Sequence, residues 1–302
     1  MNNHADNNTD DDDSRIKVFL RLRPMNALET SKRSKDCIEL HEDPSIITVD
    51  APLQGLFQFS FSHVFDEYAT QEEVYNGSRL SGISHKLLSG HDCCILAYGQ
   101  TGTGKSHLVL GPVAESPNDI ISESHGILPR ITVDLFQAIE ATVPDSTECT
   151  IKLSMLELYL ERWTDLLHPT GTVWVDANSQ IQGSSELCCL HPQDVHQALL
   201  RGFLQRTQLA PQQNQEATRS HVITQLRVEL IDRTTNIVRS ATLRVVDLAG
   251  SEQLQTRTSR KSAGPLSQEG RMVSASLQSL FNFVQAKAAV QQGTTTKPLT
   301  YP

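Results

Sequence analysis

The sequence predicts an α/β protein in which a central mixed β-sheet is flanked by helices on both faces. Three observations favour this fold class. Strand and helix patterns alternate along most of the 302 residues, as they do in α/β sheets. A glycine-rich turn follows a short apolar run at residues 93–98, and two apolar segments flank a polar turn at residues 232–236. We expect one ordered domain over residues 15–302.

The N-terminal end of the chain contrasts with the rest. Residues 1–14 are rich in Asn and Asp and contain almost nothing to bury, so we expect a disordered acidic tail. Ile16, Val18, Leu20 and Leu22 then occupy alternate positions, which is the period of a half-buried strand. Pro24 is expected to end that strand.

Apolar periodicity defines the later elements in chain order. The continuous apolar run from Cys93 to Tyr98 predicts a strand that is buried on both faces. Helical spacing of apolar residues, with Pro129 in the first turn of the first helix, predicts helices at 127–143, 194–205 and 269–287. Strands are predicted at 151–160, 222–231 and 237–248, and the last two form an antiparallel hairpin.

Composition excludes several classes of protein. The net charge of −9 argues against a general nucleic-acid binder, which needs clustered Lys and Arg. The six cysteines contain no C-x-x-C pair, so neither a zinc site nor a disulfide framework is expected. The N-terminus does not resemble a signal peptide, and no apolar run approaches the ~20 residues that span a bilayer. We therefore expect a soluble intracellular protein that does not bind membranes.

Residues 99–106 match the phosphate-binding pattern G-x-x-x-x-G-K-[ST]. Glycines in such a loop let successive backbone N–H groups point at phosphate oxygens. Lys105 would reach the β- and γ-phosphates, and the Ser106 hydroxyl would bind Mg²⁺. The alternative is a glycine-rich surface turn, but the preceding strand favours nucleotide binding. The expected nucleotide-binding residues are Gly99, Gln100, Thr101, Gly102, Thr103, Gly104, Lys105 and Ser106.

Two further motifs flank the predicted hairpin. NQEATRSH, at residues 214–221, precedes its first strand, and DLAGSE, at residues 247–252, ends its second strand. With the turn centred near residue 234, antiparallel pairing would set residue 221 opposite residue 247. Both motifs would then lie at the same edge of the sheet, where Arg219 and Glu252 could form an ion pair.

The chemistry of these motifs suggests roles at a triphosphate. Asp247 ends an apolar strand, where phosphate-loop enzymes keep a metal-associated carboxylate. Gly250 could bring a bare N–H close to the γ-phosphate, and Thr218 could offer its hydroxyl to Mg²⁺ or to the attacking water. The alternative makes Arg219–Glu252 an ordinary surface pair and Asp247 a strand-end cap.

Taken together, these segments resemble the kinesin motor domain from about Ile16 to the end of the chain. GQTGTGKS resembles the nucleotide loop of the family, NQEATRSH its first switch and DLAGSE its second switch. FSFSHVFDEYATQEEVY, GILPR and LELYLERWTDLLHP also resemble family segments, in the same order. The R-x-R-P element formed by Arg21, Arg23 and Pro24, together with His107, resembles the residues that lie beside adenine in the family.

The resemblance implies a P-loop NTPase fold and an ATPase that microtubules stimulate. Mg²⁺ would be bound by Ser106, Thr218 and Asp247, and the catalytic residues would be Thr218, Arg219, Gly250 and Glu252. Water would attack the γ-phosphate of ATP without a covalent enzyme intermediate. The region of about 253–287 would contact tubulin, which places the protein in the cytoplasm on the microtubule cytoskeleton.

Three departures from the family are visible. Ala217 replaces a switch serine, which suggests slower hydrolysis. Residues 273–277, VSASL, replace the usual I-N-x-S-L pattern of the tubulin-facing helix. Basic residues nevertheless surround that helix, and they form either a tubulin-binding stripe or a solvated loop: Arg257, Arg260, Lys261 and Arg271.

The third departure is the end of the sequence at Pro302, where the family continues with a further helix, an inner strand, a final helix and the neck linker. We therefore expect a C-terminally incomplete motor domain whose oligomerisation region lies outside this sequence. Two alternatives to a motor ATPase remain. One is a nucleotide-binding microtubule-associated protein with little turnover, and the other is a GTPase, which would need an N-K-x-D motif that is not visible.

Overall fold

The computed structural model describes residues 16–112, 122–178, 180–209, 219–251 and 268–291. The chain divides into two compact units: Met1–Ala69 with Ala275–Pro302, and Thr70–Ser274. The acidic tail predicted at residues 1–14 lies outside the described residues, as do most of the NQEATRSH motif and residues 252–267. The expectation of one domain stays a prediction.

The first unit, called the N-terminal unit below, contains two small sheets within residues 16–69. Strand β1 (Phe19–Arg21) pairs in parallel with β5 (His63–Phe65), so the strand predicted at residues 16–22 is present but shorter. Strands β2 (Ile38–Leu40), β3 (Ile46–Ala51) and β4 (Gly55–Ser60) form an antiparallel sheet. The short helix α1 (Ala27–Ser31) begins with a capping box in which Asn26 and Glu29 hydrogen-bond each other's backbone N–H.

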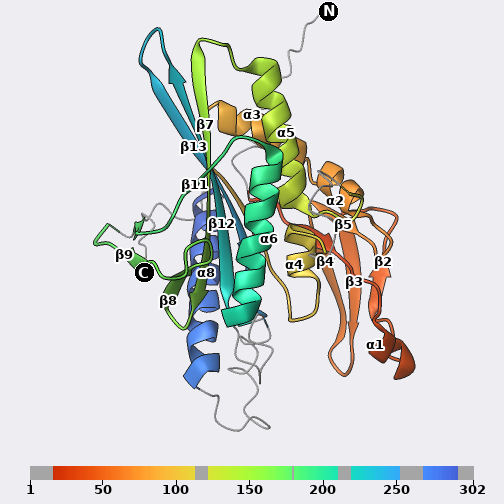
Figure 1. Cartoon of the computed structure of the whole chain (residues 1–302). Coiled ribbons are helices and arrows are strands. Elements are labelled where there is room, and N and C mark those ends of the chain that lie inside the picture. Colours follow the sequence, from red (N-terminus) through yellow and green to blue (C-terminus); the bar gives the residue numbers. More distant parts are fainter. Residues whose placement is uncertain (1–15, 113–121, 179, 210–218, 252–267, 292–302) are drawn as a thin grey trace, which may run out of the picture. The chain divides into compact units, whose positions relative to one another are not determined.

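The second unit is built on a six-stranded mixed sheet (Figure 1). Its order is β11-β7-β12-β13-β6, and β8 pairs with β7 beside this path. Strands β6 and β13 run parallel, whereas the other pairs are antiparallel. The strands are β6 (Cys93–Ala97), β7 (Thr147–Tyr159), β8 (Arg162–Asp165), β11 (Leu187–Cys189), β12 (His221–Asp232) and β13 (Val238–Asp247).

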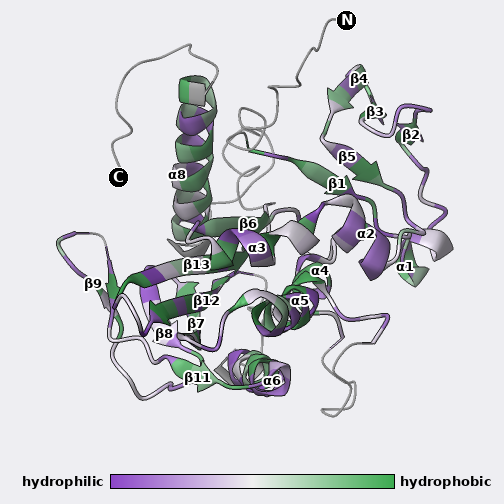
Figure 2. Cartoon of the chain, turned by 90° about the horizontal axis from the view of Figure 1, so that it is seen from above, coloured by the Kyte–Doolittle hydropathy of each residue, from purple (hydrophilic) through white to green (hydrophobic). Residues whose placement is uncertain are grey.

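Two long helices cover one face of this sheet. Figure 2 shows α5 (Ile127–Thr142) and α6 (Pro192–Leu209) side by side next to β7 and β12. The helices predicted at 127–143 and 194–205 are therefore confirmed, and α6 is longer than expected. The other elements of this unit are α2 (Gln71–Gly77), a 3₁₀ turn (Leu80–Gly82), α3 (Ile83–Leu88), α4 (Lys105–Val109), β9 (Trp174–Val175) and β10 (Ile181–Gln182).

The long helix α8 (Gln268–Gln291) matches the helix predicted at residues 269–287. Within it, Val273 and Leu277 are buried and Arg271 is exposed. Among the described residues, no helix combines the length and the apolar character that crossing a bilayer requires.

The core of the second unit lies between α5, α6 and the sheet. Leu128, Ile131 and Leu135 of α5 are fully buried with Leu153 of β7 and Leu243 of β13. Their spacing of three and four residues along α5 is the apolar stripe that the sequence predicted. The sheet that carries the loops at its edge is thereby packed against both helices.

Close packing of α6 on β7 depends on a glycine. A Cβ atom at Gly202 would overlap the sulfur of Met155 in β7. A side chain at this position would therefore require the Met155 side chain or the helix to move. Gly202 lies four residues before Arg206, on the same face of the helix.

Two expectations about the sheet are wrong in detail, and the first is the register of the hairpin. In the β12–β13 hairpin Val222, not His221, lies opposite Asp247. The register shifts by one residue because the hairpin closes at Asp232 and Ile237, with Asn236 in the left-handed conformation at φ 56°.

The second is strand β6, which is not buried on both faces. Cys94 is exposed and Leu96 is 40% exposed. Within the described part of the chain, β6 pairs with β13 alone and is therefore an edge strand. A short apolar run cannot distinguish an edge strand from an inner strand, because either can carry one.

Candidate functional site

The glycine-rich loop directly follows β6 and leads into α4. Gly102 and Gly104 have φ values of 81° and 94°, in the region where a residue with a Cβ is strained. Inside the loop, the Thr103 hydroxyl donates to the Gln100 carbonyl oxygen over 2.8 Å. These conformations explain the spacing of the glycines in the sequence.

The Lys105 side chain lies back over this loop. Its Nζ donates to the carbonyl oxygens of Gly99 and Gln100, both over 2.9 Å. These two bonds hold the ammonium group over the glycine-rich loop. The predicted phosphate contact of Lys105 fits this position.

Ser106 and Asp247 meet although 141 residues separate them in the sequence. The Ser106 Oγ donates to Oδ2 of Asp247 over 2.5 Å. Asp247 is the last residue of β13, and it pairs with Ala97 at the end of the parallel strand β6. Because parallel strands end at the same edge of a sheet, the loop after β6 and the DLAGSE motif after β13 emerge together.

The pairing of β6 and β13 continues beyond the strands. Leu248 N–H donates to the Ala97 carbonyl oxygen over 3.2 Å, and Ser251 N–H donates to the Gly99 carbonyl oxygen over 3.0 Å. Gly250, between these bonds, is buried. The predicted γ-phosphate sensor thus lies next to the glycine-rich loop.

A buried arginine from α6 completes the site. Nη1 of Arg206 donates to Oδ2 of Asp247 over 3.2 Å, and its Nε lies 3.6 Å from Oε1 of Glu157 in β7. Nη2 donates to the backbone and side-chain oxygens of Ser220, whose hydroxyl donates to Glu157 over 2.6 Å. The guanidinium therefore connects α6, β7, the end of the NQEATRSH motif and Asp247.

His221 forms a hydrogen bond with the backbone of the DLAGSE motif. Ala249 N–H donates to Nδ1 of His221 over 3.2 Å, so this nitrogen is unprotonated. Burial, with a smaller effect from the positive charge of Arg206, lowers the pKa of His221 to about 4. The ring is therefore neutral at pH 7 and can accept this bond.

Sequence reasoning missed Arg206 and Glu157. A signal was present, because Val195, Leu199, Gly202 and Arg206 follow helical spacing on one face of α6. A charged residue on the apolar face of a helix indicates either a buried ion pair or the point where the apolar face ends. The carboxylate partners, distant in the sequence, could not be identified from this pattern.

Several predicted residues cannot be placed in the site. Thr218 and Glu252 lie outside the described residues, and so does Ala217, the departure from the family pattern. Arg219 lies in the turn directly before β12 and is partly buried. Its ion pair with Glu252 stays a prediction.

The R-x-R-P residues belong to the N-terminal unit. Arg21 donates to the Ala69 carbonyl oxygen over 2.9 Å, and Arg23 forms a bidentate ion pair with Glu29 over 2.6 and 2.8 Å. This pair and the capping bond from Asn26 lower the pKa of Glu29 to about 2. A contact with adenine stays a prediction for the R-x-R-P residues Arg21, Arg23 and Pro24. It also stays a prediction for His107 of α4.

The donor set fits a magnesium ion that is shared with a nucleotide. A hydroxyl and a carboxylate oxygen, from Ser106 and Asp247, are 2.5 Å apart, and Mg²⁺ prefers such oxygen ligands. Within the described ranges, no group of three or more His, Cys, Asp or Glu side chains could hold a metal alone. Phosphate oxygens and water would supply the remaining ligands.

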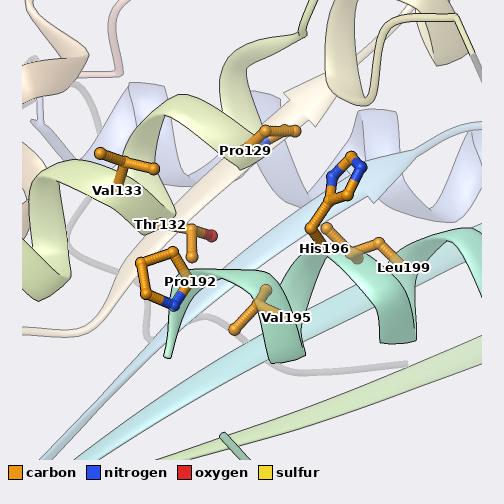
Figure 3. A pocket seen from close by; sticks show the side chains of 7 residues that line it. All are labelled: Pro129, Thr132, Val133, Pro192, Val195, His196 and Leu199. Carbon is orange, nitrogen blue, oxygen red and sulfur yellow. The ribbon is translucent and has the colours of Figure 1, made fainter. Parts of the chain in front are cut away.

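A separate small hollow lies between α5 and α6 (Figure 3). It is lined by Pro129, Thr132 and Val133 of α5 and by Pro192, Val195, His196 and Leu199 of α6. None of these residues belongs to the glycine-rich loop or to the DLAGSE motif, so this hollow is not the phosphate site.

Comparison with known proteins agrees with the geometry. The kinesin motor domain family model matches residues 21–296. The chain is 30% identical over 276 residues to the kinesin heavy chain of Gibberella moniliformis, covering 90% of this chain and 28% of that protein. It is 31% identical over 302 residues to the kinesin-like protein KIF18A of Mus musculus, covering 91% of this chain and 32% of that protein.

A solved structure supports the same relationship. It is described as a fast kinesin, with implications for ATPase mechanism and interactions with microtubules. It superimposes with a TM-score of 0.78 at 29% identity, over 94% of this chain and 77% of that one. The mixed sheet with flanking helices predicted from the sequence is thereby confirmed, and the chain belongs to the kinesin motor domain family.

Proposed function

We propose that this chain binds Mg-ATP and hydrolyses it as a microtubule-dependent motor ATPase of the cytoplasmic cytoskeleton. The observation that carries the proposal is the contact of Ser106 with Asp247, because it joins the glycine-rich loop to the second switch motif at one sheet edge. Family membership supports it. Since the chain spans 28% of the kinesin heavy chain it matches, this activity is proposed for the motor domain that it contains.

In the proposed reaction, the chain positions the triphosphate and balances its charge. Backbone N–H groups of the loop at residues 99–104 and the ammonium group of Lys105 bind the β- and γ-phosphates. Ser106, Asp247 and, by resemblance, Thr218 hold Mg²⁺, which would neutralise the charge that develops on the phosphate oxygens.

The base of the nucleotide would lie beside two other segments. By resemblance to the family, adenine would contact residues of the R-x-R-P element and of α4: Arg21, Arg23, Pro24 and His107. Because His107 directly follows Ser106 in the chain, a base contact there would extend the site from the phosphates along the same helix.

The attacking water would be placed by the two switch motifs. Gly250 N–H would face the γ-phosphate, and the proposed Arg219–Glu252 pair, with Thr218, would orient the water and accept its proton. No covalent enzyme intermediate is required, so the catalytic effect comes from position and charge. Loss of the γ-phosphate would leave the loop after β13 freer to move, because the proposed bond from Gly250 N–H to the phosphate would be lost.

The proposed tubulin contact is the region of about residues 253–287. Its described part is residues 268–287 of α8, where Arg271 and Lys287 are exposed. Exposed positive charges on this helix suit an acidic filament. The remaining basic residues, Arg257, Arg260 and Lys261, lie outside the described residues.

A turnover assay tests the proposal. We expect phosphate release from Mg-ATP to rise severalfold or more when microtubules are added, and we expect Lys105→Ala to abolish retention of labelled ATP. Lys32→Ala, the same change at an exposed position outside the site, is the control. Saturable ATP binding with turnover that stays flat on microtubules would contradict the motor ATPase, and equal ATP retention by Lys105→Ala would contradict the nucleotide site.

A further inference from the structure

The buried amide of Gln71 joins three segments next to the glycine-rich loop. Gln71 is the first residue of α2 and is 4% exposed. Its Nε2 donates to the His107 carbonyl oxygen over 2.7 Å and, at the longer distance of 3.4 Å, to the Ser124 carbonyl oxygen. His107 lies in α4, and Ser124 lies in the segment that leads into α5. One amide group thus connects α2 to both neighbours.

The first turn of α2 holds this side chain in place. Thr70 and Glu73 form a capping box, in which Glu73 N–H donates to the Thr70 hydroxyl over 3.1 Å and Thr70 N–H donates to the Glu73 carboxylate over 2.7 Å. Val74 and Tyr75, on the following turn, are buried. The backbone that carries Gln71 is therefore fixed before any ligand binds.

Helix α4 needs support of this kind. It has five residues, begins with Lys105 and Ser106, and is too short to be stable alone. The last carbonyl groups of a helix lack partners within it. The His107 carbonyl oxygen accepts from Gly111 N–H over 2.9 Å and from Gln71, so the Gln71 bond adds an anchor from outside the helix.

We propose that Gln71 is a positioning residue of the nucleotide site, which holds α4 so that Lys105 and Ser106 stay in place for the phosphates. This inference rests on the proposed nucleotide binding. Gln71 itself touches backbone oxygens of the protein and acts through α4. A residue that only filled space here could be replaced by an apolar side chain of equal length without effect on affinity.

The test compares Gln71→Met, which keeps the length and removes both donors, with Gln71→Glu, which replaces them with a carboxyl group. The full 302-residue chain is used. We expect Gln71→Met to weaken Mg-ATP binding about tenfold, because the His107 carbonyl oxygen loses the donor that anchors α4 from outside the helix. Gln71→Glu should bind more weakly still at pH 8 and recover in part at pH 6, where a protonated carboxyl group can donate. Gln197→Met and Gln197→Glu, at an exposed position of α6, should bind as the parent does.

The outcomes separate the two proposals. If the parent chain does not bind Mg-ATP, the proposed function fails. If the parent binds and Gln71→Met binds equally well, only the inference about Gln71 fails. A lower melting temperature of nucleotide-free Gln71→Met with unchanged affinity would show a packing role and would also overturn the inference. Should Gln71→Glu not fold, the uncharged Gln71→Met still decides.

Discussion

At the scale of single residues, the site contains one buried arginine beside two carboxylates. Arg206 and Asp247 are 5% and 6% exposed, and Glu157 adds a second carboxylate beside the same guanidinium. Burying charges is unfavourable unless each is paired and hydrogen-bonded. Replacing one member of this group is therefore expected to lower the free energy of unfolding more than replacing a member of an exposed ion pair.

The first prediction concerns Arg206. Arg206→Met would leave the buried Asp247 and the partly buried Glu157 without this positive partner, and we expect the free energy of unfolding in urea to fall by about 3 kcal/mol. Arg201→Met, at an exposed position of the same helix, is the control and should change stability by less than about 1 kcal/mol. Equal losses from both variants would show that the buried pairs add nothing.

The second prediction concerns pH and His221. Its pKa in the folded protein is about 4, below the usual value of 6.5, so the unfolded chain binds more protons between these values. The stability contributed by neutral His221 is complete above pH 6.5 and is lost as the pH falls towards 4. We expect a loss of about 3 kcal/mol over this range.

His221→Asn is the matched variant, because its side-chain oxygen can accept from Ala249 N–H and does not titrate. Urea unfolding at several pH values between 4 and 7 measures the difference. The parent should lose stability more steeply than His221→Asn in this range. Parallel curves for the two proteins would contradict the assignment.

At the scale of elements, the sequence predicted the long, strongly patterned segments best. Helices α5, α6 and α8 and the hairpin β12–β13 were recognisable because each has an apolar stripe or alternation. Short strands such as β9 and β10, and strands β2 to β5 of the N-terminal unit, were not predicted, because two to six residues carry too little pattern. The hairpin register was missed by one residue, since it depends on the conformation of Asn236.

The third prediction concerns the turn between β7 and β8. Leu160 and Glu161 connect Tyr159 to its partner Arg162, and both have positive φ, at 49° and 62°. Asn and Gly suit this two-residue turn better than Leu and Glu. We expect Glu161→Asn to raise the free energy of unfolding by about 1 kcal/mol, measured by thermal unfolding. Glu42→Asn, at an exposed loop position without positive φ, should give no gain in the same experiment.

At the scale of the whole molecule, the family could be recognised from the sequence because motifs separated by more than a hundred residues occur in the order that the family has. The contact of Ser106 with Asp247 follows from strand order, which the motifs imply. The Arg206–Glu157 pair could not be foreseen, since which residues meet across α6 and β7 depends on how the helix packs on the sheet. Long-range charge pairing of this kind leaves no local pattern in a single sequence.

The fourth prediction concerns binding of an acidic filament by a chain with a net charge of −9. Such binding requires a local positive surface, and Arg271 is exposed on α8. We expect Arg271→Glu to raise the microtubule concentration for half-maximal ATPase stimulation severalfold, and more so at low salt. Lys32→Glu, a matched reversal of charge outside residues 253–287, should have little effect. An unchanged concentration for Arg271→Glu would argue against α8 as the contact.

The backbone bonds that extend the β6–β13 ladder past the end of the sheet have a practical consequence. The amide proton of Ser251 is shielded only while the two loops remain bonded, so its rate of exchange with deuterated solvent reports how often they separate. A nucleotide that tightens the site should slow this exchange, and its departure should restore it. Exchange at this one backbone amide can thus report how the contact between the two loops responds to nucleotide.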